Sequence, residues 1–366
     1  MNAVMTVDLS ELDAWSAQVQ RASDDLTGIA RNGGASLVQT DFGPILSTMM
    51  GAYNALLPSI HQSLEDNGTG MLDHAEALRA TSRDFTFTES GVVARHQARA
   101  FDARDGSSQF FDVADTTIRR ARPSESSLPQ ISFGFPYDTV CDLVRMLTGF
   151  DIRAELAERI GGDVVTASAQ GSSFGCLGQS MNGVADNLAS GSRTISSSWS
   201  GGASDAAISQ MSAWVGSLNT QAGQLIAMGQ NIAAICRDAW QTALSVVQCV
   251  KAAVQTVSSA LATMSIPGIG WARVVRAVWQ AFQAVMKAYK AIMRFIDLLK
   301  RVSSLIDSVK AFFDGDRAPV SVPTAPTSSG APSSVTRDPR TVTTPTVGHA
   351  PAAPAAPSAP TASALA

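Results

Sequence analysis

Near the middle of the chain, one tryptophan stands in a run of serine and glycine, Ser196-Ser197-Ser198-Trp199-Ser200-Gly201-Gly202. On both sides of this run, apolar residues recur at steps of three and four, from Phe174 to Ile195 and from Ile208 to Ala239. This spacing places one apolar stripe on each helix, and such a stripe has to be buried against another surface. A break rich in serine and glycine between two such helices predicts an antiparallel helical hairpin.

The composition favours helices along most of the chain. Hydrophobic residues make up 45% of the 366 residues and charged residues only 16%. Alanine, leucine and methionine, which favour helix, are frequent among the apolar residues. The alternating runs of β-branched and aromatic residues that indicate strands are not found outside the tail. We therefore predict an all-α fold with two antiparallel helical hairpins, long carboxy-terminal amphipathic helices and a disordered tail.

The first predicted hairpin spans residues 1–90. Its first helix has Asp8 as a cap ahead of Glu11 and carries an apolar stripe of Leu9, Leu12, Trp15, Val19, Ala22, Leu26 and Ile29. Its second helix carries apolar residues at seven-residue spacing, Leu57, Leu64, Met71, Leu78 and Phe85. Pro58 and the sequence Asn67-Gly68-Thr69-Gly70 predict a kink or local fraying there. Residues 91–136 have the character of a charged linker, where we expect proteolysis first.

The second predicted unit spans residues 137–265, with short helices at 137–147 and 152–160 and then the hairpin at Trp199, whose first long helix is capped by Asp163. Residues 271–313 are predicted to form a basic amphipathic helix with a net charge of 8 − 2 = +6. Its expected stripe is Val275, Val278, Phe282, Val285, Tyr289, Ile292, Ile296 and Leu299. Residues 315–366 hold ten prolines among alanine, serine and threonine, a composition that predicts disorder.

The Trp-Ser-Gly sequence at the bend of the second hairpin resembles the WXG family of small helical hairpins, which are substrates of type VII (ESX) secretion. The first hairpin resembles the ESX secretion-associated subgroup, with Phe42-Gly43 near the place of Trp-X-Gly. The resemblance implies export without a signal peptide and a non-enzymatic role in protein–protein interaction. It also implies that Trp199 and Gly201 belong to an export signal that the secretion ATPase reads.

In the family, the second part of that signal is a Tyr-X-X-X-Asp/Glu motif after the second helix of the partner hairpin. This chain departs from the pattern, because none of its three tyrosines has an acid four residues later. The best-placed substitutes are Phe85 and Glu89 at the end of the first hairpin. The two hairpins of one chain could form the four-helix bundle that WXG proteins form as pairs. Pairing with a separate WXG-type protein, or self-association, is the alternative.

Few residues suit catalysis or metal binding. Four cysteines show no zinc-ligand spacing, and of four histidines, His61 and His74 are expected on solvated helix faces. We therefore predict no enzyme activity, no metal and no cofactor. Cys236 lies on the apolar stripe, where a small buried hydrophobic residue is expected. The net charge of −4 argues against a nucleic-acid partner.

Residues 1–8 have neither a basic region nor an apolar region, so we expect no signal-peptide export. The predicted location is outside the cell or at its surface, reached by type VII secretion. Two alternatives remain open at this stage. The chain could be the delivery module of a toxin system without its catalytic domain. It could also be a membrane-active protein in which residues 243–264 and 271–313 contact a bilayer.

Overall fold

The computed structural model describes residues 6–96, 109–119, 121–123, 142, 145–146, 149, 163–262 and 270–315. The described residues are mostly helical, which confirms the all-α prediction. The helices predicted at 137–147 and 152–160 and the predicted disordered tail lie almost wholly outside the described residues. The long helices are α1 (Leu9–Gly28), α2 (Ser47–His96), α5 (Val164–Ile195), α6 (Gly202–Ala262) and α7 (Gly270–Gly315).

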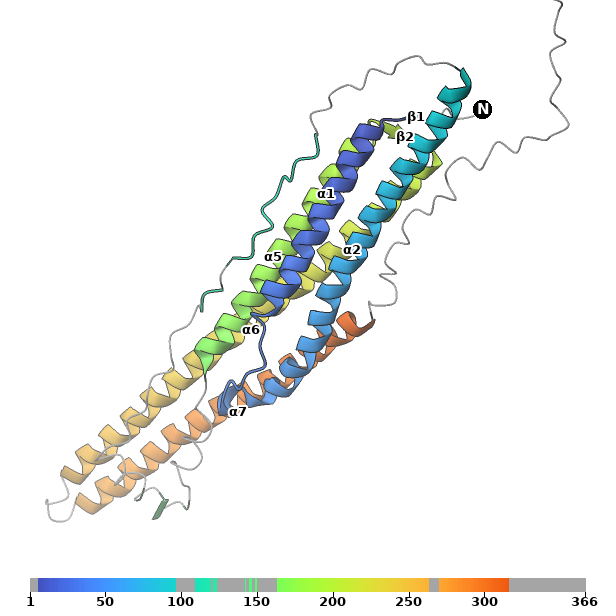
Figure 1. Cartoon of the computed structure of the whole chain (residues 1–366). Helices are drawn as coiled ribbons and strands as arrows, with labels where there is room; N and C mark the ends of the chain where they lie inside the picture. The colour runs from blue at the N-terminus through green and yellow to red at the C-terminus, as the bar shows by residue number, and fades with distance from the viewer. Residues whose placement is uncertain are drawn as a thin grey trace, which may run out of the picture. The chain divides into compact units, whose positions relative to one another are not determined.

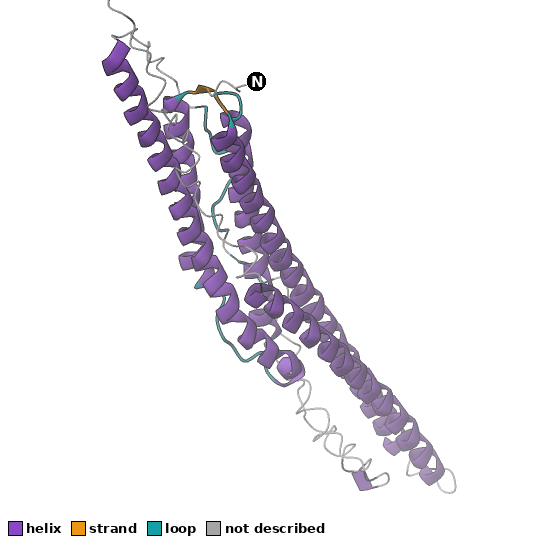
Figure 2. Cartoon of the chain, turned by 90° about the vertical axis from the view of Figure 1, so that its right-hand side faces the viewer, coloured by secondary structure: helices purple, strands orange, loops and turns teal. Residues whose placement is uncertain are grey.

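Helices α1 and α2 lie antiparallel, and α5 and α6 lie beside them (Figures 1 and 2). A π-helical turn (Ile29–Gly33) and a 3-10 turn (Pro44–Leu46) connect α1 to α2. Two strands of two residues each, β1 (Thr6–Val7) and β2 (Trp199–Ser200), pair in antiparallel fashion. This pairing joins the amino terminus to the turn between α5 and α6. Helix α7 runs back along α6 and reaches α2, where the Ser59 hydroxyl donates to the Asp314 carboxylate at 2.6 Å.

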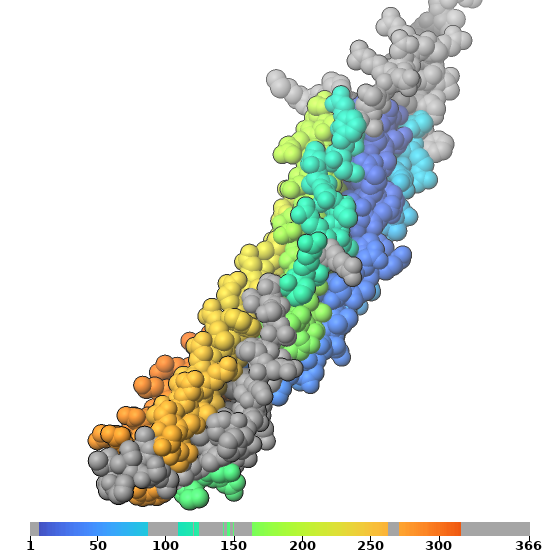
Figure 3. All heavy atoms as spheres, turned by 90° about the vertical axis from the view of Figure 1, so that its left-hand side faces the viewer, coloured from blue at the N-terminus to red at the C-terminus, as the bar shows by residue number. Residues whose placement is uncertain are grey.

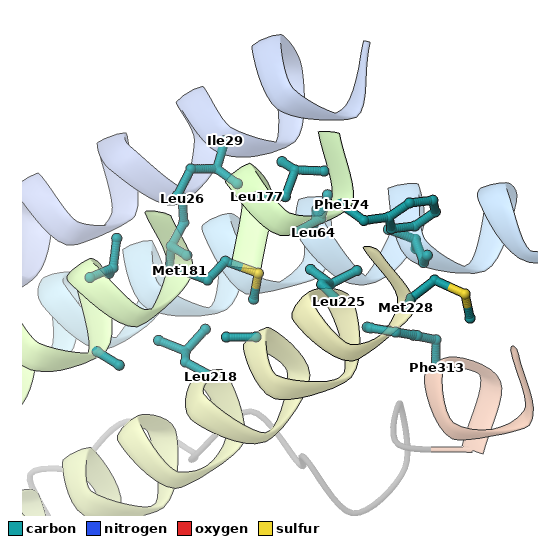
Figure 4. Close-up of a cluster of buried hydrophobic side chains, with 14 of the residues drawn as sticks. Leu26, Ile29, Leu64, Phe174, Leu177, Met181, Leu218, Leu225, Met228 and Phe313 are labelled. Carbon is teal, nitrogen blue, oxygen red and sulfur yellow. The ribbon is translucent and has the colours of Figure 1, made fainter. Parts of the chain in front are cut away.

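The main core is built from all five helices. Side chains of α1, α2, α5, α6 and the end of α7 converge in Figure 4, among them Leu26, Leu64, Leu177, Leu225 and Phe313. The apolar stripe predicted before Trp199 is buried, and the stripe predicted after it is buried from Leu218 to Ala239, Cys236 included. Ile208 and Val215 are only partly buried, and Ala207 and Trp214 are buried beside them. A second, separate cluster lies between the later part of α6 and the first part of α7. The carboxy-terminal half of α7 thus belongs to the main core and its first half to the second cluster.

Helices α5 and α6 approach each other at glycines. A Cβ atom on Gly178 would lie 2.6 Å from the carbonyl oxygen of Ala222, and one on Gly229 would lie 2.5 Å from that of Gly171. These distances are shorter than a real Cβ contact, so the two backbones can meet only because these residues have no side chain. Gly229 belongs to the apolar stripe predicted after Trp199. The small residues of this stripe therefore determine how closely α5 and α6 approach each other.

Both predicted helix caps are present. The Asp8 carboxylate accepts hydrogen bonds from the backbone N–H groups of Ser10 and Glu11. The Asp163 carboxylate accepts from the N–H of Thr166 at 2.9 Å. These bonds satisfy donors that the first turn of a helix leaves unpaired, and they explain why α1 and α5 begin where they do.

Helix α2 is continuous from Ser47 to His96 through Pro58 and residues 67–70, so of the predicted kink or local fraying, fraying does not occur there. At Gly68 the helix instead packs closely against α1. The Ser23 hydroxyl donates to the Gly68 carbonyl at 2.9 Å, and a Cβ on Gly68 would lie 2.7 Å from the Thr27 hydroxyl oxygen. Close packing of α1 therefore offsets the low helix propensity of this sequence.

The stripe predicted for α7 is buried at Val278, Val285, Ile292 and Leu299. Its other positions are less buried, because Phe282, Tyr289 and Ile296 are partly exposed and Val275 is 45% exposed. The residue before each of these four is buried instead, at Val274, Ala281, Ala288 and Phe295. This pattern repeats every seven residues, which is the spacing of a coiled coil. The small alanines face α6, because they permit closer helix contact than Phe282 or Tyr289 would.

His74 corrects the prediction of solvated histidines. Its side chain is 0% exposed, and within the described residues neither ring nitrogen has a hydrogen-bond partner. Burial lowers the pKa of His74 from 6.5 to about 4, because a charged imidazole is poorly solvated there. His61 is half-buried and lies 3.0 Å from the Gly34 carbonyl oxygen.

The pKa of His74 predicts a loss of stability on acidification. Between pH 6.5 and about 4, the unfolded chain binds a proton that the native state does not bind, so the free energy of unfolding falls as the pH falls through this window. The full difference is about 3 kcal/mol. Denaturant unfolding of the wild type and of His74→Leu at pH 7 and pH 4.5 measures it. The variant should lose clearly less stability over this range, and equal losses would contradict the prediction.

A candidate recognition site at the Trp-Ser-Gly turn

The turn between α5 and α6 is fixed by hydrogen bonds to the amino terminus. Val7 pairs with Trp199 and Thr6 with Ser200 in the antiparallel strand pair, and the Asp8 N–H donates to the Ser198 carbonyl at 3.1 Å. Gly201 has a φ of 112°, which L residues with a side chain rarely adopt. This glycine lets the chain reverse within one residue before α6 begins at Gly202.

The Trp199 side chain points inward. It is 1% exposed and lies edge-on between two rings from the other helix pair. Its centroid is 6.3 Å from that of Trp15 on α1 and 6.4 Å from that of Phe85 on α2. Edge-to-face pairs at these distances are favourable. Within the described residues, the indole N–H groups of Trp15 and Trp199 have no acceptor, so packing holds this aromatic cluster together.

The structure brings together two of the predicted signal residues, Phe85 and Trp199, and Gly201 follows directly in the turn. Glu89 lies in α2, one helical turn after Phe85, and its side chain is outside the described part. Since the two rings are buried, a partner in solution meets the residues around them. Ser200, which follows Trp199, is exposed, and so are Arg83 and Thr86 on either side of Phe85 in the sequence.

A second group of aromatic residues lies where α1 is connected to α2. Phe42 packs edge-on against Tyr53 at 5.0 Å, and Tyr53 packs against Phe174 of α5 at 6.1 Å. The Tyr53 hydroxyl donates to the Gln170 side-chain oxygen at 2.7 Å, and burial raises the pKa of Tyr53. Gly43 has a φ of 78°. Phe42-Gly43 therefore combines a buried ring with a left-handed glycine, as Trp199 and Gly201 do.

The sequence analysis missed a segment that packs across both helix pairs. Residues 109–119, inside the predicted linker, lie in an extended conformation over α1 and α5 (Figure 3). Phe110 is 4% exposed. The Arg21 guanidinium pairs with the Asp112 carboxylate at 3.0 Å and donates to the Phe110 carbonyl at 2.9 Å. We call residues 109–119 the strap.

Asn187 of α5 binds the backbone of the strap at two atoms. The Ala114 N–H donates to the Asn187 side-chain oxygen at 2.8 Å, and the Asn187 amide donates to the Ala114 carbonyl at 3.2 Å. A Cβ on Gly183, one turn before, would lie 2.7 Å from the Asp115 carbonyl oxygen. No local sequence signal marks this contact, because an extended segment without an apolar pattern has the composition of a linker.

The described residues contain no group of three or more histidine, cysteine, aspartate or glutamate side chains placed to hold a metal ion. An open hollow on α1 and α2 is lined by side chains of both charges, among them Asp13, Glu76, Arg79 and Arg83. Comparison with family models, curated proteins and solved structures found no match.

Truncation of Trp199 should destabilise the protein. Trp199→Ala removes a buried indole that touches two other rings, which costs about 3–5 kcal/mol. Trp199→Phe retains a ring and loses an N–H that makes no hydrogen bond within the described residues, so its loss should be clearly smaller. Chemical denaturation followed by circular dichroism measures both. Equal losses for the two variants would show that the edge-on ring contacts do not stabilise the fold.

The strap predicts local protection from hydrogen exchange. Asn187→Ala should speed exchange of the Ala114 amide, because its acceptor is removed, and should speed chymotryptic cleavage at Phe110 and Phe111. Asn219→Ala, at an exposed position of α6, is the matched control and should leave both rates unchanged. Wild-type cleavage as fast as that of Asn187→Ala would contradict the contact.

Proposed function

We propose that this chain is a non-enzymatic type VII (ESX) secretion substrate or secretion-associated protein. In this proposal it leaves the cell without a signal peptide and acts outside the cell or at its surface. Its activity is protein–protein interaction by a helical bundle, with the secretion ATPase as the partner during export. Neither a metal nor a cofactor takes part.

One observation supports the proposal most, namely the contact of Phe85 with Trp199 at 6.4 Å. In the family that the chain resembles, the export signal combines a Trp-X-Gly turn with a motif after the second helix of the partner hairpin. In this chain the substitutes Phe85 and Glu89 lie within α2, before its end at His96. Here Trp199 comes from the α5–α6 turn and Phe85 from the last third of α2. The two parts of such a signal therefore meet within one chain, with Glu89 on the next turn of α2.

In the same proposal, α1 with α2 and α5 with α6 act as two WXG-like hairpins that form their bundle internally. The main core contains residues of both pairs, and the strap makes hydrogen bonds to α1 and to α5. Each pair thus finds its burial surface on the other. Assembly within the chain is favoured over a separate WXG-type partner, because the apolar stripes that would bind such a partner are already buried.

A second candidate function is the delivery module of a toxin system without its catalytic domain, which would use the same two helix pairs. The described residues that follow the second hairpin belong to the bundle, because α7 returns to the main core through Phe295, Leu299 and Phe313.

An export assay tests the proposal. Wild type, Trp199→Phe, Glu89→Ala and Glu65→Ala are expressed in the native host, and their amounts in culture filtrate and lysate are compared. Wild type should appear in the filtrate, and Glu89→Ala should stay in the cells. Glu65→Ala changes an exposed glutamate of the same helix, more than six helical turns before Glu89, and serves as the matched control, which should be exported normally.

Thermal unfolding of each purified variant separates a lost signal from a lost fold. A variant that is folded but retained supports the signal, and Trp199→Phe tests whether the indole itself is needed. Retention of wild type in the lysate would overturn the proposal. Normal export of Glu89→Ala would remove Glu89 from the signal and leave the turn as its candidate.

A further inference from the structure

The later part of α6, residues 243–262, and the first part of α7, residues 270–292, form a helix pair that we call the arm. Its interior is closed by its own apolar cluster, which includes Val246, Val250, Val278 and Val285. This cluster is separate from the main core. Helix α6 has an apolar stretch with a mean hydropathy of 1.2, long enough to span a membrane. Helix α7 covers the apolar stripe of α6, and among the described residues of the arm the exposed large apolar side chains lie on α7.

That surface is a stripe on α7. Trp271 is 59% exposed, Val275 is 45% exposed and Trp279 is 56% exposed. Steps of four place these three residues along one side of the helix. The Trp279 ring packs on Phe282 at 5.6 Å, which holds it in position. Large apolar groups in water are unfavourable, and contiguous exposed groups of this kind mark interaction surfaces.

The charge of the arm identifies the partner. Between Asp238 and Asp297 the sequence contains no acidic residue, and its bases are Lys251, Arg273, Arg276, Lys287, Lys290 and Arg294. All six basic side chains are exposed. At 3.6 residues per turn, Arg276 lies beside the Trp271–Trp279 stripe on the side away from α6, and Lys287 and Lys290 follow on that side about two and three turns after Trp279. The chain as a whole is acidic, with a net charge of −4, so the arm is a local concentration of positive charge.

We propose that the arm docks on anionic lipid bilayers. Trp271, Val275 and Trp279 enter the interface, where tryptophan is favoured because its ring is apolar and its N–H is polar. The adjacent basic side chains bind headgroup phosphates. The arm lies on the membrane without crossing it, because the cluster around Val246, Val250, Val278 and Val285 holds α6 and α7 together as a pair. The inference does not depend on the export proposal.

Flotation of the full chain with lipid vesicles tests the docking. The probes are vesicles of phosphatidylcholine alone and of phosphatidylcholine with an equal amount of phosphatidylglycerol. Wild type should float with the anionic vesicles only, and less at high salt. The double variant Trp271→Ser/Trp279→Ser should bind at least about tenfold more weakly. Arg276→Gln/Lys290→Gln should bind more weakly and lose part of the salt dependence.

Leu305→Ala is the matched control, because Leu305 is a 42% exposed apolar residue of the same helix outside the arm. It should float like wild type. Circular dichroism of each variant checks that α7 is intact. Dye-loaded vesicles should keep their contents, since docking opens no pore.

Three results would overturn the proposal. Wild type that floats with neither vesicle excludes lipid docking, and equal binding by the Trp271→Ser/Trp279→Ser variant excludes this stripe. A wild-type dimer in sedimentation that becomes monomeric in that variant, without flotation, assigns the stripe to a second copy of the chain. None of these results bears on export, so the two proposals fail separately.

Discussion

Trp199 belongs to the α5–α6 turn, yet the rings it touches lie on α1 and α2. This side chain connects two helix pairs at a place where each pair ends, and the strand pair with Thr6 and Val7 holds the turn in register. Much of the arrangement depends on this burial. Without it, the contact between the pairs would rest on the stripes further along the helices, which by themselves permit sliding along the helix axis.

The strap and the aromatic group of Phe42, Tyr53 and Phe174 also connect the two helix pairs, at other positions along the bundle. Asn187 binds the strap backbone through both of its amide atoms. Tyr53 joins the connection between α1 and α2 to Gln170 near the start of α5. The helix pairs are thus linked by polar contacts along their length as well as by apolar packing. Directional bonds of this kind specify one register, which apolar packing alone does less well.

The helices were predictable wherever an apolar residue had to face another helix. The stripe from Phe174 to Ile195 is buried throughout, and Asp8 and Asp163 cap the helices that the sequence assigns to them. The prediction failed where tertiary contacts decide. His74 is buried although its residue type is commonly solvated, and the α7 stripe is shifted because alanines permit the closer approach to α6. Of the candidate site, the pairing of Phe85 with Trp199 was predictable, whereas the strap depends on Asn187 and Gly183, which no local pattern marks.

Helix α6 is continuous from Gly202 to Ala262. Its 61 residues correspond to a rod of about 90 Å at a rise of about 1.5 Å per residue. One end of this rod begins at the Trp-Ser-Gly turn and the other carries half of the arm. The main core holds the first part of α6. Because one hydrogen-bonded backbone without a loop joins the arm to the Trp-Ser-Gly turn, a movement of the arm is transmitted along α6 toward that turn.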